Sequence, residues 1–190
     1  MGTPSAISRN LLRQPFIPLR RDEIVALAAR TREEFKNCPI DEVARREKII
    51  LQRIADERTE KAGFCCILDN TAPKPIASKA RPGETLFSFA EKKRNLYPAI
   101  IINPARTKFE QEVFWHEYYH LYYSPSRKIG AVFFGGYSTA GVLDKQEERR
   151  ADLFAAFVLI PTIEKDDTIE TLTEKFGVSY ALANIRLNSQ

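Results

Sequence analysis

Apolar residues recur at helical spacing through the first third of the chain. From Asp22 to about Asn37 they return about every three to four positions, and a similar pattern with charged residues between continues from Ile40 to about Lys61. Pro39 stands at the start of the second segment, where a helix tolerates proline best. The pattern predicts two consecutive helices over these ranges.

The period changes after residue 62. Short runs of aromatic and β-branched residues, separated by Asn, Gly and Pro, are typical of strands, and they occupy Gly63–Asp69, Thr85–Phe89 and Tyr97–Ile102. The proline-rich residues 70–84 are expected to form a surface loop. The Gly-rich residues 126–144 are expected to hold a short strand or a flap.

Helical patterns return in the second half of the chain. They predict helices at Thr107–Tyr123, Lys145–Leu159, Thr168–Phe176 and Ser179–Leu187. The fold class is therefore α+β, with helices packed on a small, mainly antiparallel sheet. We expect one domain over residues 21–190, preceded by an arm at residues 1–20 that contains three prolines.

The composition is that of a soluble globular protein, with 44% apolar and 28% charged residues among 190. No apolar run approaches the roughly 20 residues that cross a bilayer, and the N-terminus lacks the apolar region of a secretory signal. Three cysteines, two of them adjacent, favour a reduced compartment over a disulfide framework. We expect a cytoplasmic protein without a membrane segment.

Both histidines of the chain lie four residues apart, in the segment His116-Glu117-Tyr118-Tyr119-His120. On a helix, positions i and i+4 share one face, so both imidazoles can reach one metal ion. Glu117 projects beside them and can take a proton from a water molecule that the metal activates. The spacing is that of the zincin peptidases. It predicts a zinc site on an active-site helix, with Glu117 as the general base.

A zincin needs a third protein ligand, and an acidic residue on a later helix is one common source. The segment Glu147–Ala156, which begins 27 residues after His120, carries Glu148 and Asp152 one helical turn apart. Glu148 is favoured as the ligand over Glu147. Asp152 is expected to accept a hydrogen bond from a ligand histidine and fix its tautomer. An ordinary charged helix face would show the same residues, and the histidine pair is what favours the metal site.

These motifs resemble the ImmA/IrrE family of metallopeptidases. The family pattern is an apolar strand ending in Asn, a His-Glu-x-x-His helix, and Glu-x-x-Ala-Asn/Asp-x-Phe-Ala-Ala leading to an apolar stretch and Pro. The corresponding segments are Ile100–Asn103, His116–His120 and Glu148–Pro161, and the likeness covers most of residues 21–187. Family members usually have Leu-Gly where this chain has Tyr118-Tyr119, and many have an acid at the place of Arg150.

The resemblance implies a bacterial or phage endopeptidase of the cytoplasm. Its substrate would be a helix-turn-helix repressor, cut in response to DNA damage or to induction of a mobile element. The alternative is a non-catalytic regulator or toxin-like partner, which keeps the metal for structure and acts by binding a repressor. An open fourth metal position favours the peptidase. A closed site with four ligands favours the regulator. One of Cys38, Cys65 or Cys66 is a candidate fourth zinc ligand, which would keep the enzyme latent.

Two further groups of residues have both a functional and a structural interpretation. Residues 168–187 have the rhythm of a helix-turn-helix, but a helical pair that covers the sheet or the active-site helix is favoured. The tyrosines around the histidine motif are candidates to stabilise an oxyanion, although aromatic residues at helical spacing belong more often to the core. They are Tyr118, Tyr119, Tyr122, Tyr123 and Tyr137.

Basic residues with aromatic neighbours suggest a nucleic-acid ligand. The chain has a formal charge of +4, and several basic residues fall in segments expected to be exposed: Arg13, Arg20, Arg21, Lys74, Lys79, Arg81, Lys92, Lys93 and Arg94. A basic track with stacking rings binds single-stranded nucleic acid without sequence preference. Single-stranded DNA is therefore a candidate activator, and a merely solvated basic surface is the alternative.

Overall fold

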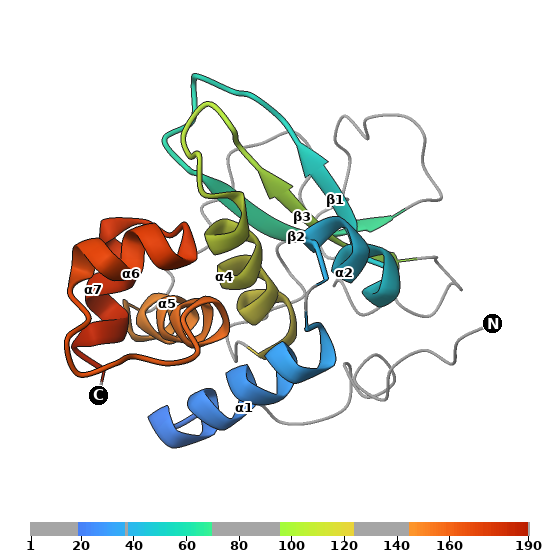
Figure 1. Ribbon diagram of the computed structural model, residues 1–190. Coiled ribbons are helices and arrows are strands. Elements are labelled where there is room, and N and C mark those ends of the chain that lie inside the picture. Colours follow the sequence, from blue (N-terminus) through green and yellow to red (C-terminus); the bar gives the residue numbers. More distant parts are fainter. Residues whose placement is uncertain (1–18, 37, 70–95, 124–144, 190) are drawn as a thin grey trace.

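The computed structural model describes residues 19–36, 38–69, 96–123 and 145–189. This part of the chain forms six helices and a three-stranded sheet, which confirms the predicted α+β class (Figure 1). The helices are α1 (Arg21–Glu34), α2 (Ile40–Glu47), α4 (Glu110–Tyr123), α5 (Lys145–Leu159), α6 (Ile169–Phe176) and α7 (Tyr180–Leu187). The predicted arm up to residue 18, the strand at Thr85–Phe89 and the residues 126–144 lie outside the described residues.

The sheet consists of β1 (Ile50–Arg53), β2 (Gly63–Asp69) and β3 (Leu96–Ile102), in the order β1-β3-β2. β3 pairs with β2 in antiparallel orientation along all 7 residues of each strand, and with the 4 residues of β1 in parallel orientation. The sheet is therefore mixed, and its longer ladder is antiparallel.

The predicted helix over Ile40–Lys61 is wrong beyond residue 47. α2 ends at Glu47, because Lys48 adopts the left-handed conformation (φ 57°, ψ 36°), and β1 begins at Ile50. Apolar residues at positions 50 and 51 fit a helical period as well as a short strand. These residues form a strand because they pair in parallel orientation with β3, which lies far away in the sequence.

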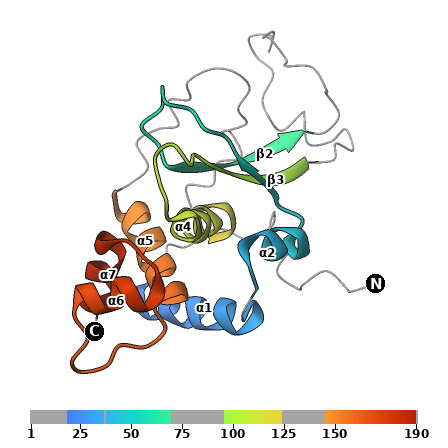
Figure 2. The same cartoon turned by 45° about the horizontal axis from the view of Figure 1, so that its top comes forward.

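Helix α4 lies between the sheet and helices α1 and α5, whereas α2 lies next to β1 (Figures 1 and 2). It contacts β2 and β3 on one side and α5 on the other, and α5 in turn contacts α1 and α7. Tyr118 and Tyr119, the two residues that depart from the family pattern, are 0% exposed and pack in this core. Their ring centroids lie 6.4 and 5.6 Å from that of Phe154 on α5. Aromatic packing thus fixes α4 against α5.

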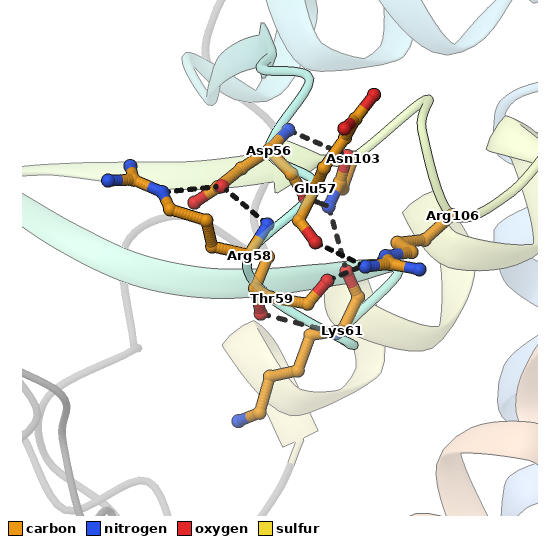
Figure 3. A network of polar contacts seen from close by, with 7 residues as sticks. All are labelled: Asp56, Glu57, Arg58, Thr59, Lys61, Asn103 and Arg106. Atoms are coloured by element: carbon orange, nitrogen blue, oxygen red, sulfur yellow. Dashed lines mark hydrogen bonds and ion pairs between the residues drawn. The ribbon is translucent and has the colours of Figure 1, made fainter.

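Asn103, at the end of β3, holds the loop between β1 and β2 (Figure 3). Asn103 is 4% exposed. Its side chain accepts a hydrogen bond from the Asp56 amide and donates to the carbonyls of Asp56 and Lys61. Arg106 adds bonds to the carbonyls of Thr59 and Glu57. The Asn of the sequence motif therefore has a structural role: it ties the β1–β2 loop to the chain segment that leads from β3 to α4.

Candidate metal centre

Two neighbouring helices bring the predicted ligands together. His116 and His120 occupy one face of α4, and Glu148 projects from the first turn of α5. The buried Ala151 and Ala155 of α5 are small residues, which suits close packing of α5 against α4. The ligand atoms of the three side chains all lie within 4.8 Å of one another. This group could hold a metal ion.

The spacing of the donor atoms fits a tetrahedral ion. The Nε2 atoms of His116 and His120 are 3.1 Å apart. Glu148 Oε2 lies 3.2 Å from His116 Nε2, and Glu148 Oε1 lies 3.4 Å from His120 Nε2. With bonds of about 2.0 to 2.1 Å, a tetrahedral zinc ion separates its ligand atoms by about 3.3 to 3.4 Å. Small adjustments of the side chains therefore suffice to bind one.

Asp152 determines which nitrogen of His116 carries the proton. Its Oδ1 lies 2.8 Å from His116 Nδ1, so Nδ1–H donates to the carboxylate and Nε2 of the neutral ring keeps a lone pair. That lone pair points at the other two donors. Nδ1 of His120 is buried and makes no hydrogen bond among the described residues. Two imidazole nitrogens and a carboxylate therefore converge on one point, where a cation can bind once His116 gives up its Nε2 proton.

The electrostatics of the metal-free site point the same way. Burial lowers the pKa of His116, but the hydrogen bonds to Asp152 and Glu148 outweigh it and raise this pKa to about 10. Hydrogen bonds from His116 and His120 hold the pKa of Glu148 well below its usual range. The two carboxylates thus keep a proton on His116 when no metal is present, and a divalent cation can replace that proton.

Glu147 has a different environment from Glu148. It is 2% exposed, forms an ion pair with Arg150, and does not belong to the metal-binding group. The structure thus places Glu148, and not Glu147, beside the histidines, as the sequence favoured. Arg150 stands where many ImmA/IrrE proteins have an acid, and it is the partner of Glu147 in this ion pair. The roles of the ligands stay predictions.

Glu117 lies between α4 and β2. It is half-buried and lies close to the thiol of Cys65 on β2. Burial first, and then the charge of Glu117, raise the pKa of Cys65 well above its usual range. The sequence placed the cysteines in the core or at a fourth ligand position and missed this contact. Among the described residues, the metal-binding group contains no cysteine.

The tyrosines next to the histidines belong to the core. Tyr118, Tyr119 and Tyr122 are buried, and Tyr123 packs against them. Burial raises the pKa of Tyr123 to about 12. The core interpretation is therefore confirmed for these four, and Tyr137 lies outside the described residues.

The C-terminal helical pair packs against α5 through α7. Thr168 and Ser179 cap the N-termini of α6 and α7, and Gly177 ends α6 in the left-handed region (φ 63°). Arg186, the basic residue of α7, is 7% exposed, and its guanidinium lies 4.1 Å from the Phe157 ring centroid. It donates to the carbonyls of Ile160 and Pro161. Arg186 is therefore used inside the protein, which supports a structural role for the pair.

Most of the predicted basic track lies outside the described residues. Of its members the structure describes Arg20 and Arg21. Arg20 pairs with Asp22 and Glu23, and Arg21 donates to the Ser189 carbonyl. Single-stranded DNA as an activator stays a prediction.

No protein-family model matches the chain, and no curated protein or solved structure matches it either. The likeness to ImmA/IrrE proteins accordingly rests on the quoted motifs. Among the helices of the described residues, none combines the length and the apolar character needed to cross a bilayer.

Proposed function

We propose that this chain is a zinc-dependent peptidase whose metal is held by His116, His120 and Glu148. The observation that carries the proposal is the convergence of His116, His120 and Glu148, one ligand atom of each lying within 4.8 Å of the others. A structural zinc site takes four protein ligands, whereas a catalytic site has three and an open position. The metal-binding group of the described residues has three, which favours the peptidase over the non-catalytic regulator.

The surrounding residues then have distinct roles. Bound zinc would supply a Lewis acid that polarises the scissile carbonyl. Glu117 takes the proton of the attacking water and passes it to the leaving amine. Asp152 accepts the Nδ1 proton of His116 and so keeps Nε2 free as a donor to the metal.

As the substrate we propose a helix-turn-helix repressor, cleaved in the cytoplasm during a DNA-damage, stress or phage-related response. This part of the proposal is supported by the resemblance of the motifs to ImmA/IrrE proteins. The packing of Arg186 against α5 favours α6 and α7 as part of the peptidase over a DNA-recognition unit.

The experiment compares the wild-type chain with Glu117→Gln, using a peptide library from a proteome digest and any helix-turn-helix protein encoded beside the gene. The purified chain should carry about one zinc ion, His116→Ala or His120→Ala should lose it, and Glu117→Gln should keep zinc and fold but abolish cleavage. Glu110→Gln, on the same helix and paired with Arg53, is the matched control. Cleavage by Glu117→Gln at the wild-type rate would show that Glu117 is not the base.

A further inference from the structure

β2 lies along α4 in a register set by one close contact. A β-carbon at Gly63 would lie 2.2 Å from Val113 Cγ1 and 2.9 Å from the Ile101 carbonyl oxygen. Real β-carbons do not approach this closely, so only glycine fits beneath Val113. Gly63 therefore allows β2 to come close to α4 at this point.

The same register places Cys65 beneath Glu117. Side chains alternate along a strand, so Cys65 shares the face of Gly63, and Glu117 lies one turn beyond Val113 on α4. Two strand residues advance about 6.6 Å and four helix residues about 6 Å, so the next contact on this line joins Cys65 to Glu117. The effect of the Glu117 charge on the pKa of Cys65 fits two side chains that meet at this point.

The thiol is suited to remain a donor. Because burial and the nearby charge of Glu117 raise the pKa of Cys65, its sulfur stays protonated at neutral pH. Cys66, the next residue, points to the opposite face of β2. Burial raises the pKa of Cys66 to about 11, and Glu117 acts on it through its charge.

We propose that Cys65 is a positioning residue for Glu117: its S–H group holds the carboxylate against β2, so that one oxygen faces the attacking water. Glu117 has several rotatable bonds and follows a metal ligand directly, so without a second contact its carboxylate would sample several positions. Displacing a reacting group by about 1 Å can cost on the order of 100-fold in rate. The inference rests on the proposed function, but the hydrogen bond itself can be tested without any activity.

The hydrogen bond is tested by infrared spectroscopy of the S–H stretch, which lies in a region free of other protein bands. Cys65→Ala identifies the Cys65 band by its loss. Glu117→Ala should shift that band to higher frequency and leave the Cys66 band, assigned with Cys66→Ala, in place. An unchanged Cys65 band in Glu117→Ala would refute the contact.

The positioning role is tested on a peptide that the wild-type chain cleaves. Cys65→Ala should lower kcat on the order of 10- to 100-fold with KM and zinc content unchanged, and Cys65→Ser, which keeps a donor, should recover most of the loss. Cys66→Ala and Cys66→Ser are the controls and should match wild type. Wild-type kcat in Cys65→Ala, or no recovery by Ser, overturns the inference. A wild-type chain that cleaves nothing overturns the proposed function and the positioning role with it, even where the infrared band demonstrates the contact.

Discussion

At the scale of single residues, the candidate site depends on which acids face the histidines. Glu148 lies within 3.4 Å of both Nε2 atoms, whereas the neighbouring Glu147 is buried in an ion pair with Arg150. One position along the helix changes the direction of a side chain by about 100°. Adjacent glutamates of the same chemistry therefore have unrelated roles.

Glu148→Ala should weaken zinc binding much more than Glu147→Ala does, because only Glu148 can donate an oxygen to the ion. Asp152→Ala should have a smaller effect than Glu148→Ala, within the roughly 10- to 100-fold loss typical of residues that orient a ligand. Competition with a chromophoric chelator measures the three affinities. Equal losses for the two glutamates would refute the assignment of Glu148.

Zinc affinity should rise with pH by about tenfold per unit up to about pH 10, because zinc must displace the proton held by His116. In the metal-free protein the same raised pKa contributes stability that is complete below pH 6.5 and is lost as the pH rises through about 10. Chelator competition at a series of pH values measures the slope. In Asp152→Asn the slope should level off at a lower pH, and the same profile in both proteins would contradict the role of Asp152.

Local spacing could predict some of these residues but not others. His116 and His120 share a face by helical periodicity alone, and the pair Glu148 and Asp152 follows the same rule. The contact of Cys65 with Glu117 depends on how β2 lies on α4, which the Gly63–Val113 contact sets. Nothing near Cys65 in the sequence indicates this register.

At the scale of elements, the first half of the chain shows where periodicity is insufficient. β2 was predicted with its observed bounds because its aromatic and β-branched residues are flanked by turn residues. For β1 the periodicity predicts a helix, since charged residues on both sides of Ile50 and Leu51 continue the pattern of α2. A strand this short forms because β3 supplies its backbone partners, and that partner is not visible locally.

Gly63→Ala should destabilise the fold by about 1 to 3 kcal/mol, the usual cost of an extra group in a packed core. Its methyl would overlap Val113, so Val113→Ala should recover part of the loss in the double variant. Urea denaturation of both single variants and the double variant gives the coupling energy. Strictly additive effects would show that the two residues do not meet.

At the scale of the whole molecule, the C-terminal helices complete the support of the site. α7 packs on α5, and Ser179 donates hydrogen bonds from its amide and hydroxyl to Glu112 of α4. Both helices that carry the candidate ligands therefore contact the C-terminal pair. Its structural role explains why Arg186 points inward.

Arg186→Met should lower the free energy of unfolding by about 2 to 4 kcal/mol, because it leaves two carbonyls without their donor while keeping most of the apolar stem. Lys175→Met, at an exposed ion pair of α6, is the comparison and should change stability little. Thermal and urea unfolding measure both. If Arg186→Met lowers the free energy of unfolding no more than Lys175→Met does, the hydrogen bonds from Arg186 to the end of α5 do not stabilise the fold.

The central place of β3 in the sheet has a consequence for biosynthesis. β1 leaves the ribosome well before β3, and among the described strands β3 is its only partner. The sheet of the described residues therefore cannot form until residues 96–102 have been synthesised. The helix with both histidines follows at once, and Glu148 emerges later still. If the chain binds zinc as proposed, the complete set of ligands is present only after all three strands have left the ribosome, so the metal would act late in folding.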